Sequence, residues 1–381
     1  MDCVIRHFER FDDLPEAYAG LRAVLARQGL FGDPAWFELL LTHHFGGRDR
    51  LCLLGVEDAR DGRPLLLAPM RLTRHDGAAP GALVLASIHH NENYAAANVA
   101  IDDEVHEPVR LVEQMFSRLR RHEVTPGGEP PDLVRLMPLE PGSALGDALY
   151  EGLRAAGWPV QVFANSFNRY EDTAGLSHED YFAARSANLR YSVRRRRRAL
   201  EKAGGLELTI VRDPEHLEPA LLDYLQVTHG SWKNPHTMAD PTLLAMIRLS
   251  AARGCLRLGL LRVNGEPAAT QFWIATGGVG YCVRLAYDRR FAKQAVGIVL
   301  TDHMIGQLLD LDRVERLDFG YGGEGAKTPW MSQERVFVGL IAFNTGRWAG
   351  RWQALRHLGG QPVKRALKAV RDRLRQERTP A

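Results

Sequence analysis

Three short apolar segments in quick succession constrain the fold of the second half of the chain more than any other feature. They are "CLRLGLLRVNG", "EPAATQFWIATGG" and "GVGYCVRLAYD", and together they span residues 255–288. Each reads as a β-strand bounded by turn residues. A helical apolar pattern over residues 297–311 comes next, and the strand-like "VERLDFGYGG" follows it. Strands and helices in this order predict a mixed sheet that is covered by helices.

The first half of the chain shows a similar layout. "LPEAYAGLRAVLARQG" and "EPVRLVEQMFSRLRRH" carry helical apolar spacing, while "RLCLLGVED" and "LVRLMPLE" read as strands. Because 381 residues exceed the usual size of one compact core, we expect two domains. The sequence therefore predicts an α/β fold with mixed sheets, in two domains of residues 1–165 and 166–381. The second domain is expected to end in a long basic helix.

Composition places the chain among ordinary globular proteins. Hydrophobic residues make up 45%, and the formal net charge of +3 is too small to argue for nucleic-acid binding by the whole chain. The four cysteines are far apart and form no CxxC pair, which fits a reducing compartment. The N-terminal "MDCVIRHFERFDD" lacks an apolar signal region, and no run approaches the about 18 apolar residues of a membrane span. We expect a cytoplasmic protein without a membrane span.

The stretch "YDRRFAKQAVGIVL" at residues 287–300 places basic residues directly before a helix. The start of a helix leaves backbone N–H groups unpaired and carries partial positive charge, so it suits an anion such as phosphate. An ordinary basic turn is the alternative. Within the stretch, Gln294 to Gly297 ("QAVG") has the Q/R-x-x-G spacing of a pyrophosphate loop.

This loop and its surroundings resemble a known family. "AYDRRFAKQAVGIVL" followed by "RLDFGYGGEGAKTPW" is similar to the GNAT-superfamily acetyltransferases found beside cellulose and other exopolysaccharide synthesis genes. An Arg-rich helix, "NLRYSVRRRRRALEKAG", precedes both, as it does in that family. Proteins of this type resemble tandem GNAT domains and the Fem peptidyltransferases. Three positions depart from the pattern: Ala295-Val296 replaces Ser-Pro, and Ala326 replaces a Tyr.

The resemblance implies a donor site for acyl-CoA, a co-substrate, in the second domain only, with no permanently bound cofactor. Backbone N–H groups of the loop would hold the pyrophosphate, the basic side chains would add charge, and the end of the preceding strand would pair with the pantetheine arm. The residues expected to bind the donor are Arg284, Leu285, Ala286, Arg289, Arg290, Lys293, Gln294, Ala295, Val296 and Gly297.

Three residues are candidates for catalysis. Asp318 lies on a strand between Leu317 and Phe319. It is a general base, a residue that orients the base, or a buried structural carboxylate that pairs with Lys327. His229 has the chemistry to deprotonate an amine, or it simply ends a helix. Tyr287 is expected either to protonate the departing thiolate or to pack in the core.

The acceptor side is expected to involve aromatic and basic residues. Trp232 follows His229 in "THGSW", and Lys327 and Trp330 belong to "KTPW". Lys327 is expected to contact an acceptor carboxylate or the donor phosphates, and a solvated loop lysine is the alternative. The run of five arginines at residues 194–198 points all round a helix, so only some of them can share a face. Arg194 and Arg198 are the members assigned to a phosphate-bearing acceptor or to tRNA, and a solvated face is the alternative.

The reaction that these expectations describe is direct N-acyl transfer from acyl-CoA to a primary amine, either an amino sugar of an exopolysaccharide or an amino acid or peptide. Aminoacyl-tRNA-dependent peptide-bond formation of the Fem type is an alternative, and a non-catalytic ligand-sensing protein is another. No metal is expected, because the His pair of "HHNENY" (residues 89–94) is a poor ligand set and the reaction needs none.

Overall fold

The computed structural model describes residues 2–77, 79–90, 98–121, 125, 128–202, 204–231, 240–321 and 329–359. It divides the chain into two compact units. Unit 1 contains residues 1–166 together with the chain from residue 336 onward, and unit 2 contains residues 167–335. The expected mixed α/β fold is confirmed in both units.

The strands of unit 1 lie in the order β1-β2-β3-β4-β6-β13, and β5 pairs with β3. Most neighbours are antiparallel, but β4 and β6 are parallel, so the sheet is mixed. The strands are β1 (Cys3–Phe8), β2 (Arg50–Asp58), β3 (Pro64–Thr73), β4 (Val84–Ser87), β5 (Ala100–Ile101), β6 (Leu133–Leu139) and β13 (Gln333–Phe343).

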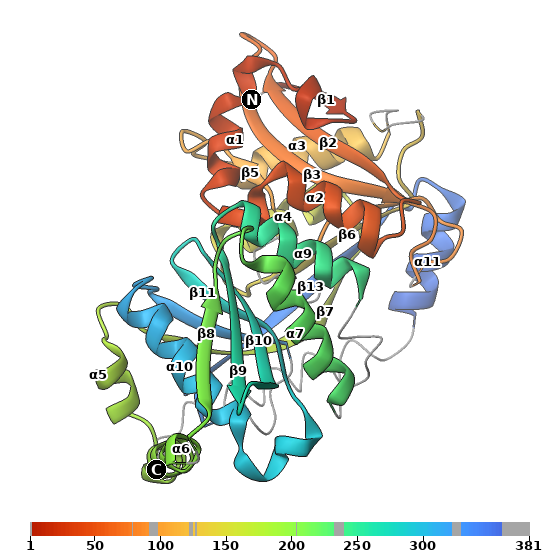
Figure 1. The fold of residues 1–381 in the computed structure, drawn as a ribbon. Coiled ribbons are helices and arrows are strands. Elements are labelled where there is room, and N and C mark those ends of the chain that lie inside the picture. The colour runs from red at the N-terminus through yellow and green to blue at the C-terminus, as the bar shows by residue number, and fades with distance from the viewer. Residues whose placement is uncertain are drawn as a thin grey trace. The chain divides into compact units, whose positions relative to one another are not determined.

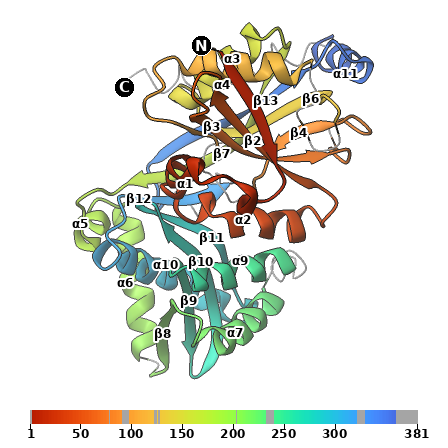
Figure 2. The same cartoon turned by 90° about the horizontal axis from the view of Figure 1, so that it is seen from above.

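Helices cover both faces of this sheet (Figure 2). On one face α3 and α4 bury their apolar stripes against β2, β3 and β6 in a single core cluster, and α1 and α2 lie on the other face (Figure 2). The α-helices of the unit are α1 (Ala19–Ala26), α2 (Pro34–Leu39), α3 (Pro108–Leu119), α4 (Ala144–Ala155) and α11 (Trp348–Leu358), and the short helical turns are η1 (Phe11–Asp13), η2 (Glu16–Tyr18), η3 (Gly29–Gly32) and η4 (Leu40–His44).

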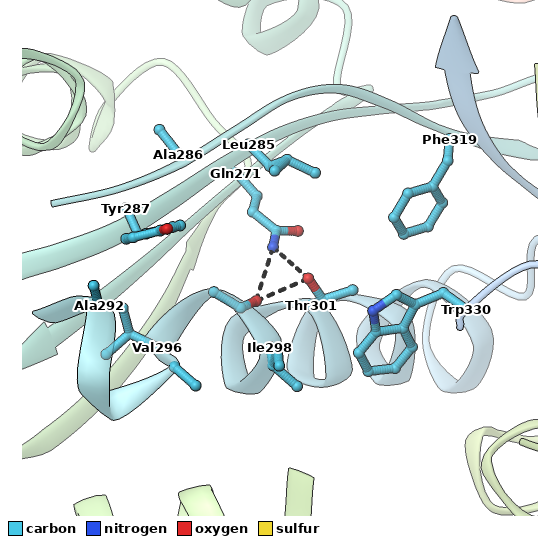
Figure 3. A pocket seen from close by; sticks show the side chains of 12 residues that line it. Gln271, Leu285, Ala286, Tyr287, Ala292, Val296, Ile298, Thr301, Phe319 and Trp330 are labelled. Carbon is cyan, nitrogen blue, oxygen red and sulfur yellow. Dashed lines mark hydrogen bonds between the residues drawn. The ribbon is translucent and has the colours of Figure 1, made fainter. Parts of the chain in front are cut away.

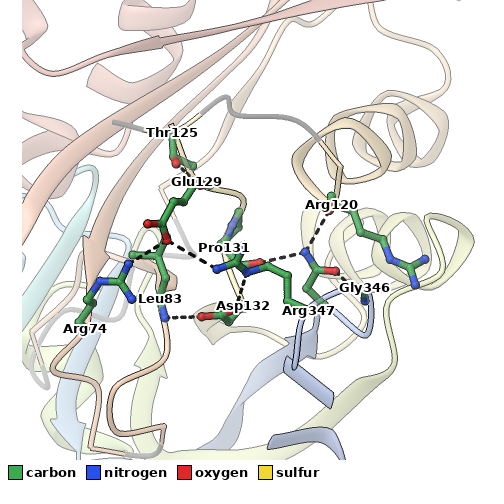
Figure 4. Close-up of polar contacts among 10 residues, drawn as sticks. Arg74, Leu83, Arg120, Thr125, Glu129, Pro131, Asp132, Gly346 and Arg347 are labelled. Atoms are coloured by element: carbon green, nitrogen blue, oxygen red, sulfur yellow. Dashed lines mark hydrogen bonds and ion pairs between the residues drawn. The ribbon is translucent and has the colours of Figure 1, made fainter. Parts of the chain in front are cut away.

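The end of the chain belongs to unit 1, which differs from the expected second domain of residues 166–381. After Arg335, β13 runs antiparallel to β6, with Val338 opposite Leu139 and Phe343 opposite Leu133. A network of polar contacts then holds the residues between β13 and α11 (Figure 4). The physical reason for the difference is that strand pairing joins segments far apart in the chain, and such pairing leaves no local signal in the sequence.

The strands of unit 2 lie in the order β7-β12-β11-β10-β9-β8. Strands β8 to β11 are antiparallel neighbours, whereas β11 and β12 are parallel because α10 connects them. The strands are β7 (Val160–Asp172, whose first part belongs to unit 1), β8 (Leu206–Val211), β9 (Leu256–Val263), β10 (Glu266–Thr276), β11 (Val279–Tyr287) and β12 (Arg316–Tyr321).

Two groups of helices sandwich this sheet (Figure 1). On one face α10 packs its apolar residues, among them Val299, Leu300 and Met304, against β9 to β11, and on the other face α7 contributes Val227, which packs on Ala286. The described helices are α5 (His178–Ala183), α6 (Ala187–Lys202), α7 (Leu217–Gly230), α9 (Pro241–Ala252), η5 (Arg289–Gln294) and α10 (Val296–Asp310). The start of α10 is therefore placed directly beside the end of β11.

Candidate functional site

The loop between β11 and α10 begins with a capped turn. The buried carboxylate of Asp288 accepts a hydrogen bond from the backbone N–H of Arg290 at 2.9 Å. The Arg290 guanidinium donates to the same carboxylate and also to Glu266. Burial works against the charge on Asp288, but the hydrogen bonds from Arg290 outweigh it and lower the pKa of the carboxyl group. The first residues of the loop are thus fixed.

Ala295 turns the chain from η5 into α10. Its φ of 53° and ψ of 40° lie in the left-handed region, and no side chain caps the helix there. The first turn of a helix leaves backbone N–H groups without intrahelical acceptors, and here that turn begins with Val296 and Gly297. Among the described residues, a Cβ at Gly297 would contact only Tyr287 Cδ1, at 3.7 Å. An anion can therefore approach this helix start closely.

Strands β11 and β12 pair at their starts and then part. The pairing described by the structure joins Val279 to Arg316, Gly280 to Leu317 and Tyr281 to Asp318. Beyond Tyr281, β11 continues to Tyr287 alongside β10. The end of β11 therefore lies at the point where the two strands diverge.

A cavity of about 230 Å³ lies between this divergence and the first turns of α10 (Figure 3). β11 and α10 supply most of its wall, and Phe319 of β12 and Trp330 complete it. Among the described residues that line it, only Tyr287 has an ionisable side chain. The lining residues are Gln271, Leu285, Ala286, Tyr287, Ala292, Ala295, Val296, Gly297, Ile298, Thr301, Phe319 and Trp330. The cavity suits an extended, largely apolar ligand with an anion at the helix end.

Gln271 on β10 fastens α10 to the sheet beside this cavity. Its amide nitrogen donates to Thr301 Oγ1 at 2.7 Å and to the Gly297 carbonyl at 3.4 Å (Figure 3). Thr301 Oγ1 donates to the same carbonyl at 2.8 Å, and the indole N–H of Trp273 donates to Gln271 Oε1. The sequence interpretation missed Gln271 and Thr301, because a Gln in an apolar strand and a Thr in a helix carry no local signal.

Seven residues predicted from the sequence meet in this one cavity. Five were expected to bind the donor, Tyr287 was expected to act in catalysis and Trp330 was assigned to the acceptor. They are Leu285, Ala286, Tyr287, Ala295, Val296, Gly297 and Trp330.

The other residues expected at the donor site lie around the loop and do not line the cavity. Arg289, Lys293 and Gln294 are exposed on η5, and Arg290 is engaged with Asp288 and Glu266. Arg284 is half-buried, and burial lowers the pKa of its guanidinium. Two exposed cations, Arg289 and Lys293, thus precede the helix start on η5, while Arg290 of the same turn is already paired.

Asp318 is fully buried and hydrogen-bonded on both carboxylate oxygens. Oδ1 accepts from Asn168 Nδ2 at 2.6 Å and from the backbone N–H of Gly320 at 2.8 Å, while Oδ2 accepts from Arg335 at 2.8 Å. Burial raises the pKa of this carboxyl group, and the Arg335 charge opposes the rise. This geometry fits a structural carboxylate, whose cationic partner in the described part of the chain is Arg335. Lys327, its expected partner, lies outside the described residues.

His229 is exposed at the end of α7. It lies near the start of the loop of residues 288–295 between β11 and α10, which we call the donor loop because the sequence predicts the donor there. Ser231 forms an isolated β-bridge with Asp288, and a Cβ at Gly230 would collide with the Asp288 carboxylate at 2.4 Å. The C-terminal end of α7 therefore packs against the first residue of the loop. Trp232 lies outside the described residues.

The five arginines divide between two sides of α6. Arg196 reaches the donor loop, where its guanidinium donates to the Lys293 carbonyl at 2.9 Å. Arg197 pairs with Glu201 one turn away. The remaining three lie on the exposed side, where an open concavity of about 510 Å³ is lined by Ala187, Arg190, Tyr191, Arg194, Arg195 and Arg198.

The described residues contain no group of three or more His, Cys, Asp or Glu side chains that could hold a metal ion. Burial, together with Arg71, Arg135 and neighbouring histidines, lowers the pKa of His89 to about 3. Residues 91–94 of the polar loop "HHNENY" lie outside the described residues.

Residues 187–328 match the model of a family described as an acetyltransferase (GNAT) domain. The matched segment begins at α6 and includes β11, α10 and the described part of β12. No protein with a curated description matches the sequence significantly.

Several solved structures are similar to this chain. FemX has a TM-score of 0.55 and 11% sequence identity, over 90% of this chain and 97% of that one. A tandem GNAT protein from the clavulanic acid biosynthesis pathway has a TM-score of 0.45 and 12% identity, over 90% and 99%. L-PGS from Bacillus licheniformis has a TM-score of 0.45 and 12% identity, over 85% and 95%. Of these three, FemX alone exceeds a TM-score of 0.5, so the likeness in fold is to FemX.

Proposed function

We propose that this protein is an N-acyltransferase that moves an acyl group from acyl-CoA to a primary amine. The observation that carries the proposal is the cavity at the start of α10, lined by the end of β11 and by Phe319 of the diverging β12. The match of residues 187–328 to an acetyltransferase (GNAT) domain supports the same chemistry.

The donor would lie with its pyrophosphate at residues 295–297 and its pantetheine arm along the end of β11. The left-handed Ala295 and the open space beside Gly297 allow phosphate oxygens to reach backbone N–H groups. Arg289 and Lys293 are exposed nearby and add positive charge. The apolar lining of the cavity suits the uncharged part of the donor.

The reaction is direct attack of the amine nitrogen on the thioester carbonyl. A carbon–nitrogen bond forms, the tetrahedral intermediate collapses, and the carbon–sulfur bond breaks to release CoA thiolate. The thiolate takes up one proton and the former amine loses one. Tyr287, whose side chain lines the cavity, is our candidate to protonate the thiolate.

For the proton that leaves the amine, we favour His229 over Asp318. His229 is exposed at the end of α7, beside the start of the donor loop, whereas Asp318 is fully buried and already bonded to Asn168, Gly320 and Arg335. In this account Asp318 fixes the strands around the site and exchanges no proton with the acceptor.

The acceptor that we propose is an amino sugar of an exopolysaccharide, or an amino acid or peptide amine. The exposed concavity on α6, with Arg194 and Arg198, suits a phosphate carried by that acceptor. Trp330 lines the cavity on the side away from η5 (Figure 3). We retain Trp232 and Lys327 as acceptor contacts on the basis of the sequence motif alone.

A second candidate function is peptide-bond formation with aminoacyl-tRNA as donor. The likeness in fold to FemX favours it. A concavity lined by four arginines also suits the phosphates of an RNA. A non-catalytic protein that senses an acyl-CoA is a third candidate, because Ala295-Val296 and Ala326 depart from the acetyltransferase motif.

Thermal unfolding of the full chain with CoA, acyl-CoAs of increasing length and tRNA separates these candidates. A ligand that binds the folded state at 100 times its dissociation constant stabilises it by about 2.7 kcal/mol. We expect stabilisation by CoA and acyl-CoA, followed by release of free thiol when a panel of amines is added. Stabilisation by tRNA alone would support the second candidate, and acyl-CoA binding without turnover on any amine would support the third.

A further inference from the structure

The cavity beside α10 is open at one end and closed at the other. At the η5 end Ala292 is exposed, and Ala295 and Gly297 are half-buried. At the other end Phe319 and Trp330 are only 2% and 3% exposed. Figure 3 shows these two rings on the far side of the cavity from Ala292. We call Phe319 and Trp330 the aromatic wall, because an extended ligand that enters past the helix start ends against them.

Hydrogen bonds hold the backbone of Trp330 in place. Its carbonyl oxygen accepts from the Tyr181 hydroxyl at 2.5 Å and from the Arg185 guanidinium at 2.9 Å. Arg185 also pairs with Glu171, and the two side chains are only 9% and 10% exposed. Glu171 Oε2 in turn accepts from the backbone N–H and the hydroxyl of Ser332, both at 2.6 Å. Moving Trp330 out of the cavity would therefore break hydrogen bonds to a buried ion pair.

Trp273 packs against Phe319, the other member of the aromatic wall. The two rings are perpendicular and their centroids are 5.1 Å apart, which is a favourable edge-to-face arrangement. Trp273 is fully buried, and its indole N–H donates to Gln271 Oε1 at 2.8 Å. Phe319, Trp330 and Trp273 belong to one core cluster. Because a close-packed core resists displacement, the aromatic wall fixes the length of the cavity.

The described residues that line the closed end of the cavity carry no charge. Gln271 and Thr301 are polar, but they bond to each other and to the Gly297 carbonyl oxygen. A ligand carboxylate placed beside them would lose its hydration without gaining a cation, which is unfavourable. The closed end therefore suits an uncharged group.

The volume of the cavity is small for an acyl-CoA. It is about 230 Å³, whereas pockets for drug-sized ligands measure roughly 300–1,000 Å³. The pantetheine arm and the acyl group of the proposed donor must share this space. A short acyl group then fits between the thioester and the aromatic wall, and a long one does not.

We propose that the aromatic wall restricts the donor to a short, uncharged acyl group, and that Trp330 sets the longest chain that is accepted. This inference rests on the proposed function, since it takes the donor to be an acyl-CoA with its pyrophosphate at residues 295–297. Long-chain acyl groups are excluded because they run into Phe319 and Trp330. Acyl groups that carry a second carboxylate are excluded because the closed end has no cation for them.

Calorimetric titration with CoA and with acetyl-, butyryl-, octanoyl- and succinyl-CoA tests the proposal. The parent should bind octanoyl-CoA at least about tenfold more weakly than acetyl-CoA, because overpacking is unfavourable. It should also bind succinyl-CoA at least about tenfold more weakly than butyryl-CoA, which has an acyl chain of the same length.

Replacement of Trp330 should lengthen the cavity. We expect Trp330→Ala to bind octanoyl-CoA at least about tenfold more tightly than the parent does, with little change for acetyl-CoA, since each newly buried methylene strengthens binding by about fourfold. Trp330→Phe, which disturbs the core less, should move the same preference by about fourfold and carries the test if Trp330→Ala does not fold. Unfolding temperatures report on folding.

The matched control is Trp158→Phe. Trp158 is an equally buried tryptophan in unit 1, and its indole N–H donates to the Phe116 carbonyl oxygen. This variant should keep the chain-length preference of the parent. The inference is overturned if the parent binds octanoyl-CoA as tightly as acetyl-CoA, or if a folded Trp330 variant discriminates as the parent does. Those results leave CoA binding intact, whereas a parent that binds neither CoA nor any acyl-CoA would overturn the proposed function as well.

Discussion

The guanidinium of Arg196 donates to the carbonyl oxygen of Lys293 at 2.9 Å, which joins the arginine-rich helix α6 to the loop that precedes α10. One of the five consecutive arginines therefore acts on the candidate donor site through the backbone of that loop. The others point elsewhere, since Arg197 pairs with Glu201 and Arg194, Arg195 and Arg198 line the exposed concavity.

Arg196→Ala should weaken CoA binding, because the loop loses a charged hydrogen bond to its backbone. A hydrogen bond to a charged group contributes roughly 1.5–3 kcal/mol, so a loss of about tenfold in affinity is expected for this half-exposed contact. Calorimetric titration with CoA measures it. Arg195→Ala, one residue away on the exposed side, is the matched control and should bind CoA like the parent. Equal affinity of Arg196→Ala and Arg195→Ala for CoA would show that Arg196 does not contribute to the donor site.

Tyr287→Phe should lower kcat by about 10²-fold while CoA affinity stays the same, because the hydroxyl is proposed to protonate the departing thiolate. Steady-state kinetics with a reactive amine, together with CoA titration, makes the comparison. An acyl thioester whose thiolate is a better leaving group should restore much of the rate. A variant that loses CoA affinity as strongly as it loses kcat would show that Tyr287 only shapes the cavity.

Asp318→Asn should destabilise the protein rather than remove a base from the reaction. The side chain of Arg335 is nearly buried, and the substitution removes the carboxylate that pairs with it. Breaking a buried ion pair in this way lowers the free energy of unfolding by about 3–5 kcal/mol. Denaturant unfolding measures the change. Asp172→Asn is the matched control, since it breaks the exposed pair with Arg316 at the other end of the β7–β12 pairing and should cost less than about 1 kcal/mol. Full stability of Asp318→Asn together with a large loss of kcat would identify Asp318 as the base.

His178 should make the stability of the protein depend on pH near neutrality. Its ring nitrogen Nε2 lies 3.0 Å from Asp302 Oδ1, which ties α5 to α10, and this hydrogen bond raises the pKa of the imidazole although burial opposes it. The folded protein therefore holds the proton more tightly than the unfolded chain, whose His pKa is about 6.5. The stabilisation is full below that pH and is lost as the pH rises through the higher folded value.

Unfolding of the parent and of His178→Gln between pH 5.5 and 9, in steps of about half a unit, measures this contribution. The difference in the free energy of unfolding between the parent and His178→Gln should shrink as the pH rises. His216→Gln is the control, because His216 makes a similar contact with Asp213 in full exposure to solvent and should show little effect. A difference in the free energy of unfolding that grows with pH would contradict the stabilising role of protonated His178.

The sequence alone predicted the part of the fold that local pattern determines. The strands β9, β10 and β11 and the helix α10 follow directly from the apolar periodicity of residues 255–311, and the glycine spacing of "QAVG" marked the helix start. The short elements β1 and α5 were not predicted, because six residues carry too little periodicity.

Contacts between residues that are far apart in the chain could not be predicted from the sequence. Asp318 was recognised as important, but its partners Asn168 and Arg335 are brought to it by strand pairing that no local pattern reveals. The same holds for Gln271 and Thr301, which are thirty residues apart in the chain. The return of β13 to unit 1 was missed for this reason too.

The most direct test of the account is the affinity for CoA when the space beside Gly297 is filled. A Cβ there makes only an ordinary contact with Tyr287 among the described residues, so Gly297→Ala should fold normally, and Gly297→Leu would extend a side chain toward the cavity and the path of the phosphates. Calorimetric titration of the parent and both variants, with unfolding temperatures as the folding check, is the measurement. We expect a small loss of CoA affinity for Gly297→Ala and a loss of CoA affinity of at least about tenfold for Gly297→Leu. A Gly297→Leu protein that folds and binds CoA as tightly as the parent would contradict it.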